Sequence, residues 1–177
     1  MSRIGGHAMV RRRHWLLAVV ALGVIWIHGC DEEQLSKVAL KAQYHYTAEC
    51  TYCDLRVDGS KITYTYFEAD RERCDRWLVQ APCWTQNDLK TATGTLSKRE
   101  RRDLASLIAR SGFLNLKDTY GEEHESARYY PYTLEVTVGE QVRRVEYRSR
   151  PDAPPMPEAF VKVRDRLLEL AEGIADG

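Results

Sequence analysis

Apolar and polar residues alternate in five stretches of the chain, which is the pattern of half-buried β-strands. The first stretch runs from Val38 to Tyr46, and the next two, 53–57 and 62–66, flank Asp58-Gly59. Asp-Gly favours a tight hairpin turn because both residues tolerate positive φ. The last two, 132–138 and 141–148, are joined by Gly139-Glu140, whose leading glycine suits a type II′ turn.

The two-residue loop at Gly139-Glu140 fixes how the last two strands should pair. Counting back from the loop pairs Val138 with Gln141, Leu134 with Val145 and Tyr132 with Tyr147 on one face. Glu135 and Arg144 then lie opposite each other on the other face, where cross-strand charges of opposite sign attract. The sequence therefore predicts a hairpin with an ion pair on its exposed side.

Two other stretches follow the 3.6-residue period of an amphipathic helix. In 97–111, Ser97 and Glu100 form a capping box at the start, and Gly112 supplies the left-handed residue that ends the helix. The second helix opens at Pro157, and its buried stripe consists of Phe160, Val163, Leu167, Leu170 and Ala171. The order of elements predicts an α+β fold, an antiparallel sheet of about five strands with two helices packed on one face.

The N-terminus has the pattern of a bacterial export signal. Residues 1–29 contain four arginines and no acidic residue, and Arg11, Arg12 and Arg13 precede the apolar run from Trp15 to Ile27. That run has 13 residues, whereas a membrane-spanning helix needs about 20. The run closes in Ile27-His28-Gly29-Cys30, which resembles a lipobox. The resemblance implies cleavage before Cys30 and acylation of its thiol with chains such as palmitate.

Several readings of this segment stay open. Cys30 is instead a free cysteine if the segment is an ordinary cleaved signal, and Arg12-Arg13 also loosely fits a twin-arginine signal. Met9 fits a shorter start than Met1. Asp31 resembles an inner-membrane retention signal, but the leaflet is left open. We expect a lipid-anchored protein of the bacterial cell envelope that faces the periplasm or the exterior.

Charge and length describe a single acidic domain after cleavage. The chain from Cys30 onward carries 22 basic and 26 acidic residues, a net charge of −4, so no nucleic-acid partner is expected. Residues 30–36 form the lipidated end and a tether, and residues 37–173 form one domain. An insert at about 68–90 interrupts the pattern of strands and contains two cysteines.

Four cysteines remain in the domain: Cys50, Cys53, Cys74 and Cys83. An even number in an oxidising compartment indicates disulfides, and the two local pairs, Cys50 with Cys53 and Cys74 with Cys83, are preferred over crossing pairs, which stay open. Cys50 and Cys53 also have the spacing of a redox dithiol or a metal-binding pair. Neither a helix N-terminus nor a cation is predicted beside them, and the spacing of the second pair does not suit zinc. We therefore expect neither a metal nor a cofactor.

No catalytic constellation is found in the sequence. His124 lies among glutamates in a predicted loop, where acidic runs are usually solvated, and His45 is the only other histidine of the mature chain. A G-x-S-x-G or H-E-x-x-H motif is absent from the sequence. Within the insert, Trp77, Trp84 and Arg76 are of the types that dominate contact hot spots. They are candidates for binding a partner, although packing of both indoles onto the sheet or within the insert is slightly favoured.

Three segments resemble a known group of proteins. They are Cys53 to Gly59 with Thr63-Tyr64, Leu96-Ser97 to Leu116, and Tyr132 to Val136 before the last helix. Together they are similar to small bacterial envelope proteins of uncharacterised function and, more distantly, to emfourin, an inhibitor of thermolysin-like metallopeptidases. The resemblance covers roughly residues 38 to 171, and no inhibitory residue of emfourin matches a position here.

The function expected from the sequence is therefore non-enzymatic. We expect a lipid-anchored module that binds an envelope protein, with a protease as the partner that the resemblance implies. The alternative is a periplasmic thiol/disulfide or metal-binding protein that uses Cys50 and Cys53.

Overall fold

The structure, a computed structural model, describes residues 39–68, 71–75, 82–121, 130–149 and 153–176. The predicted signal at 1–29, Cys30 with the tether, and the residues Arg76, Trp77 and His124 lie outside these ranges. Among the described helices, none combines the length and apolar composition needed to cross a bilayer.

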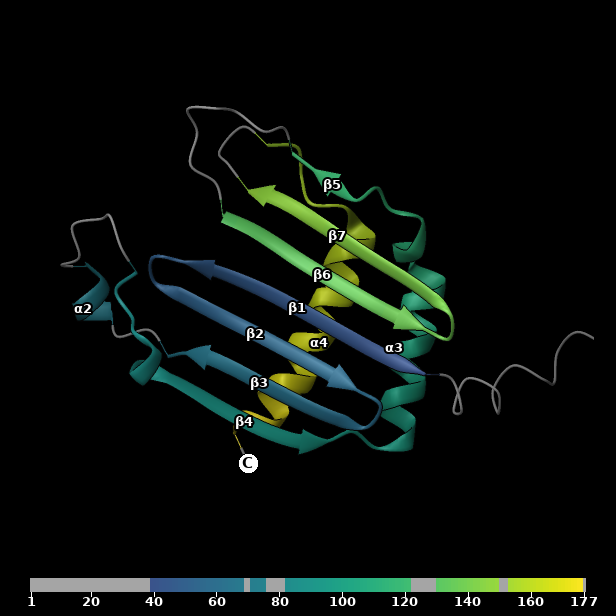
Figure 1. The fold of residues 1–177 in the computed structure, drawn as a ribbon, viewed down its shortest axis with the longest axis horizontal. Helices are drawn as coiled ribbons and strands as arrows, with labels where there is room; N and C mark the ends of the chain where they lie inside the picture. Colours follow the sequence, from purple (N-terminus) through teal and green to yellow (C-terminus); the bar gives the residue numbers. More distant parts are fainter. Residues whose placement is uncertain (1–38, 69–70, 76–81, 122–129, 150–152, 177) are drawn as a thin grey trace, which may run out of the picture.

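A single seven-stranded sheet forms the body of the domain (Figure 1). Its strands are β1 (Leu40–Ala48), β2 (Thr51–Asp58), β3 (Lys61–Phe67), β4 (Leu89–Thr95), β5 (Thr119–Tyr120), β6 (Tyr130–Val138) and β7 (Gln141–Ser149). They lie in the order β4-β3-β2-β1-β6-β7-β5. All neighbours are antiparallel except β5 and β7, which are parallel. The predicted α+β class is confirmed, whereas five antiparallel strands was too few.

The two unpredicted strands lie at opposite edges of the sheet. β5 has two residues, too few for any alternation. β4 begins at Leu89, inside the predicted insert, and at its even positions Ala92 and Gly94 pair with Tyr64 and Ile62 of β3. A side chain at Gly94 would come within 2.5 Å of Ile174 Cγ2, so the last turn of the C-terminal helix requires a small residue there. Because small residues occupy the inward positions of β4, its sequence lacks the alternation of large apolar and polar residues that predicts a strand.

The predicted hairpins form with one shift. The last hairpin has the predicted register, including Leu134 opposite Val145 and Glu135 opposite Arg144, and Gly139 has a φ of 64°. In the first hairpin Asp58 is the last residue of β2 and pairs with Lys61, so the turn residues are Gly59 and Ser60, not Asp58 and Gly59. Gly59 has a φ of 61°, the conformation that favours glycine.

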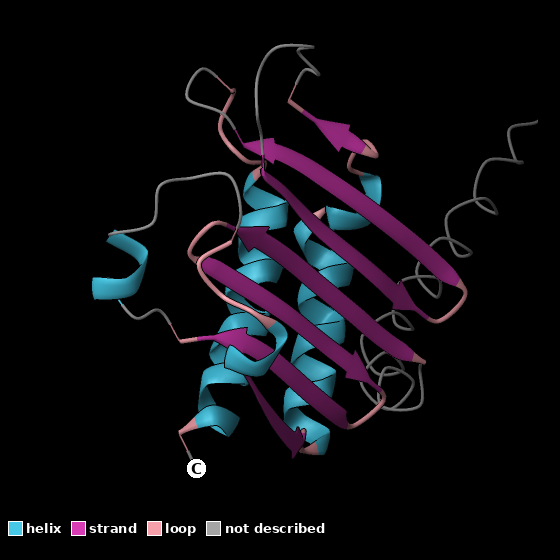
Figure 2. Ribbon diagram, turned by 60° about the vertical axis from the view of Figure 1, so that its left-hand side comes forward, coloured by secondary structure: helices cyan, strands magenta, loops and turns pink. Residues whose placement is uncertain are grey.

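Two long helices cover one face of the sheet (Figure 2). They are α3 (Lys98–Ser111) and α4 (Glu158–Ala175), and the described part also contains the short α2 (Arg71–Asp75) and the 3₁₀ turns η1 (Gln86–Asp88) and η2 (Phe113–Asn115). The capping box is confirmed: Glu100 N donates to Ser97 Oγ at 3.2 Å, and Ser97 N donates to Glu100 Oε2 at 2.8 Å. Gly112 has a φ of 84°. α2 was not predicted, because five residues are too few to show helical periodicity.

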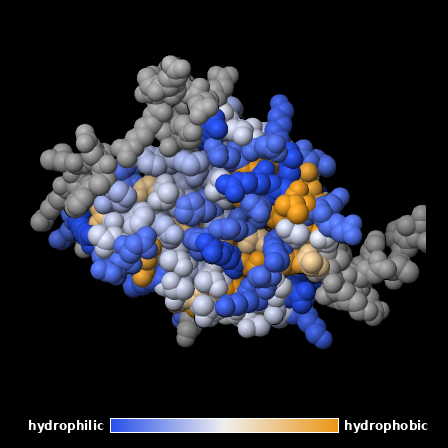
Figure 3. Space-filling view, viewed as in Figure 1, coloured by the Kyte–Doolittle hydropathy of each residue, from blue (hydrophilic) through white to orange (hydrophobic). Residues whose placement is uncertain are grey.

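The core lies between the helices and the sheet. Among the described residues no polar or charged side chain is buried. The fully buried large side chains come from both layers: Phe113, Phe160, Leu55, Ile62, Leu104, Ile108, Leu134 and Leu167. No described helix lies on the other face of the sheet, which is mostly hydrophilic, as expected for an antiparallel sheet with one solvated face (Figure 3).

Candidate functional site

One of the two predicted disulfides forms. Cys74 in α2 is bonded to Cys83, which precedes η1, with 5.5 Å between their Cα atoms. The bond links the two described parts of the insert, 71–75 and the segment that begins at residue 82. Arg73 beside it donates to both carboxylate oxygens of Asp88, at 2.9 and 3.1 Å. These hydrogen bonds, followed by those from Thr85, hold the pKa of Asp88 well below its usual range.

The other predicted disulfide is wrong: Cys50 and Cys53 are free thiols. Cys50 lies in the turn between β1 and β2, whereas Cys53 lies inside β2. An extended chain advances roughly 3.3 Å per residue. Over three residues this places the two Cα atoms farther apart than the roughly 4.4–6.8 Å that a disulfide spans. The same separation also keeps the two thiols from acting as a redox pair.

Cys53 is part of the core and not of a reactive site. Its side chain is 6% exposed, and it pairs across the sheet with Tyr46 on β1 and Tyr66 on β3. Burial, and secondarily the charge of Asp54, raises the pKa of the Cys53 thiol to about 12, although a hydrogen bond with Tyr64 opposes the shift. A thiol that stays protonated at neutral pH is a poor nucleophile and metal ligand.

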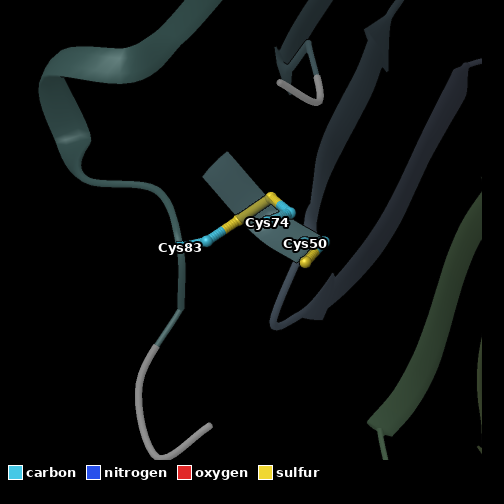
Figure 4. Close-up of side chains that lie close together, drawn as sticks. All are labelled: Cys50, Cys74 and Cys83. Carbon is cyan, nitrogen blue, oxygen red and sulfur yellow. A yellow bond between two sulfur atoms is a disulfide. The ribbon is translucent and has the colours of Figure 1, made fainter. Parts of the chain in front are cut away.

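Cys50 instead lies beside the disulfide of the insert. The sulfur atoms of Cys50, Cys74 and Cys83 all lie within 4.8 Å of one another (Figure 4). The backbone holds this arrangement, because Cys83 N donates to Glu49 O at 2.8 Å in the turn that contains Cys50. We call these three residues the sulfur cluster. It was missed from the sequence, since nothing in the spacing shows that the insert returns to the β1–β2 turn.

Trp84, predicted as a contact residue, packs within the domain. Its indole Nε1 donates to Ala48 O at 3.1 Å, and its ring meets Tyr52 edge-on with 4.9 Å between centroids. The side chain is half-buried. Trp84 therefore anchors the insert to β1 and β2, and the structure favours the packing role over the contact role. Its predicted companions Trp77 and Arg76 lie outside the described residues.

A shallow hollow on the open face of the sheet does not form a catalytic pocket. It measures about 140 Å³ and is lined by Gln43, His45, Thr133, Glu135 and Arg144. Pockets for small-molecule substrates usually measure roughly 300–1,000 Å³. The Thr133 hydroxyl donates to the backbone oxygen of His45 at 3.3 Å, and Arg144 pairs with Glu135 at 3.5 Å. These polar groups link neighbouring strands.

The outer edge of β4 is the longest open feature of the described backbone. β4 is the terminal strand of the sheet and has seven residues (Figure 1). Leu96 N donates to Ser60 O at 2.7 Å, and antiparallel ladders alternate, so the even residues of β4 bond to β3. The backbone groups of Thr91, Thr93 and Thr95 therefore point away from the sheet.

This edge lacks the usual protection against pairing with another chain. Natural edges are short, charged, bulged or interrupted by proline. β4 contains no proline, and its one charged residue, Lys90, is paired with Glu68. The opposite edge differs: β5 has only two residues, and beside it Asp118 pairs with Arg143 at 2.8 Å. The two edges of the sheet are therefore unequal among the described residues: β4 is open to a further strand along all seven residues, whereas β7 is paired with β5 at Glu146 and Tyr147 and is open only at its shorter stretch 141–145.

The described residues offer two features that the sequence did not predict, the β4 edge and the sulfur cluster. The resemblance to emfourin and to small envelope proteins stays a prediction. Neither a protein-family model nor a curated protein matches this chain.

Proposed function

We propose that this chain is a non-enzymatic lipoprotein of the bacterial envelope that binds a protein partner by adding one of the partner's extended segments to β4. The sequence around Cys30 supports the lipid anchor. The open, seven-residue edge of β4 is the observation that carries the binding role. Strand addition of this kind takes its affinity from backbone hydrogen bonds and its specificity from alternate side chains.

The chemistry of β4 suits such pairing. Its outward amides and carbonyls at Thr91, Thr93 and Thr95 provide donors and acceptors in register for an extended peptide. Each net hydrogen bond contributes about 0.5–1.5 kcal/mol, so several are needed together. The threonine side chains at these positions are exposed on the open face, and β-branched residues favour the extended conformation.

Charge at the end of α4 favours a partner over a second copy of this chain. The last turn of α4 lies over β4, where Ile174 contacts Gly94, and it contains no basic residue. Glu172 and Asp176 are exposed there, at the negative end of the helix dipole. Symmetric pairing of two β4 strands would bring two such acidic ends together. The partner's segment should instead carry basic side chains on the helix side.

Thr93→Pro is expected to weaken binding at least tenfold while leaving the domain folded. The Thr93 amide points away from β3, so proline removes an outward donor without breaking the β3–β4 ladder. Losing a central hydrogen bond and introducing the ring should cost about 1.5–3 kcal/mol of binding, a tenfold or larger fall in affinity. Thr93→Val is the matched control, because it keeps the backbone donor and the β-branched shape.

Photo-cross-linking in membranes of the native host measures the effect of Thr93→Pro on partner binding at β4. A photoreactive amino acid at Thr91 should give an adduct with another protein that disappears in the Thr93→Pro background and persists with Thr93→Val. The same probe at Lys41, exposed on β1, should not give that adduct. An adduct that survives Thr93→Pro contradicts the proposal, as does a proline-sensitive adduct of twice the chain's own mass, which would identify the occupant as a second copy.

A further inference from the structure

We propose that Cys50 and the Cys74–Cys83 disulfide form a thiol–disulfide exchange site, in which the bond moves between two pairs of cysteines. The inference is independent of the partner that binds β4. It rests on the sulfur cluster, where a free thiol lies within 4.8 Å of both sulfurs of a disulfide. Cys50 is half-buried, so its thiol is not sealed in the core as that of Cys53 is.

The exchange needs no external oxidant or reductant. The Cys50 thiolate attacks Cys83 Sγ, a Cys50–Cys83 bond forms, and the Cys74–Cys83 bond breaks with its electron pair on Cys74. The proton that Cys50 has lost to solvent is matched by the one that Cys74 takes up. One disulfide and one thiol are present before and after the step, so the number of electrons is unchanged.

The backbone indicates Cys83 as the sulfur that is attacked. Cys83 N bonds to Glu49 O, and the next residue, Trp84, bonds to Ala48 O, so residue 83 is fixed beside the turn that carries Cys50. Cys83 is fully buried, whereas Cys74 is half-exposed. A solvated thiolate is the better leaving group because burial disfavours the charged form. Release of Cys74 is therefore favoured over release of Cys83.

The exchange changes what holds α2. In the structure α2 is bonded covalently to Cys83 and is also held by the pair of hydrogen bonds from Arg73 to Asp88. After exchange only the noncovalent contacts remain, and a new bond ties Cys83 to the β1–β2 turn. Arg73 and Asp88 keep Cys74 near the cluster, which makes the step reversible. The exchange therefore determines which cysteine carries the free thiol of the cluster, Cys50 before the step and Cys74 after it.

Alkylation of the full mature chain without reductant tests the exchange. At about pH 8, iodoacetamide followed by acid quenching and nonreduced peptide mapping should label Cys50 in some molecules and Cys74 in others, faster as the pH rises. Labelling of Cys74 should fall about tenfold or more in Cys50→Ser, which has no attacking thiol. Cys53→Ser, the matched control, should label Cys74 as the unaltered chain does.

A second variant tests the geometry directly. Cys74→Ser, treated with glutathione disulfide, should form a Cys50–Cys83 bond, because those two sulfurs already lie within 4.8 Å. Two results overturn the proposal, each on its own. One is Cys74 labelling that is absent from the unaltered chain or unchanged in Cys50→Ser, and the other is a Cys74→Ser chain in which Cys50 and Cys83 stay unbonded.

Discussion

Raising the pH from about 8 to about 11 is expected to remove about 2.5 kcal/mol from the free energy of unfolding through Cys53 alone. Burial raises the pKa of this thiol from 9.0 to about 12. Above pH 9 the unfolded chain has therefore lost a proton that the folded chain keeps. Stability falls with a slope of about 1.4 kcal/mol per pH unit while the unfolded form is ionised and the folded form is not.

Two tyrosines, the buried Tyr44 and the half-buried Tyr64, steepen the loss at the upper end of this range. Burial raises the pKa of Tyr44 strongly, and it raises that of Tyr64 from 10.0 to about 12. Both phenols ionise more readily after unfolding, so each also lowers stability as the pH rises above 10. The domain should be most stable below pH 9.

Denaturant unfolding at a series of pH values measures this slope. Cys53→Ala should flatten the curve by about 1.4 kcal/mol per pH unit between pH 9 and 11, and Val142→Ala, an exposed substitution that removes no titratable group, should leave the slope unchanged. The comparison uses the slope because Cys53→Ala also leaves a small cavity that lowers stability at every pH. Equal slopes for Cys53→Ala and the unaltered chain would show that Cys53 does not stay protonated in the fold.

Phe160→Ala is expected to lower the free energy of unfolding by about 3–5 kcal/mol. Phe160 is the first buried residue of α4 and is fully buried. Its ring meets that of Phe113, which follows α3, with 6.1 Å between centroids. Removing it opens a cavity at the point where the two helices and the sheet meet. A loss of this size is a large fraction of the 5–15 kcal/mol of a typical domain.

Val142→Ala is the control for this substitution. It also shortens an apolar side chain, but Val142 is 63% exposed, so the expected change is within about 0.5 kcal/mol. Chemical denaturation monitored by tryptophan fluorescence measures both variants. Similar losses for Phe160→Ala and Val142→Ala would contradict the packing of α4 against the sheet.

The sequence predicted elements whose signals are local. The register of β6 and β7 follows from a two-residue loop and a period of two, and the ends of α3 follow from Ser97, Glu100 and Gly112. Each of these signals lies within a few residues of the feature that it determines. The stripe of α4 was also correct, because five buried positions repeat at the helical period.

What was missed depends on contacts between distant segments. β4 has no apolar alternation because Gly94 must admit Ile174, a residue 80 positions later in the chain. Likewise, the three-residue spacing of Cys50 from Cys53 does not decide which sulfur atoms lie beside Cys50. That arrangement is decided by the return of Cys83 and Trp84 to the β1–β2 turn, which no local pattern encodes.

The candidate site shows the same division between local and distant information. Residue types correctly indicated a disulfide between Cys74 and Cys83. They left two roles open for Trp84, because an indole beside a cross-link has the same composition whether it packs inward or faces a partner. The β4 edge was invisible before the order of strands was known.

Intact mass spectrometry of the alkylated, unreduced chain recovered from host membranes tests the envelope-lipoprotein claim most directly. A membrane-anchored binding domain should begin at Cys30, carry acyl chains on that residue, contain one disulfide and take up two alkyl groups after unfolding. An unacylated chain, or a chain that begins elsewhere than Cys30, would contradict the account.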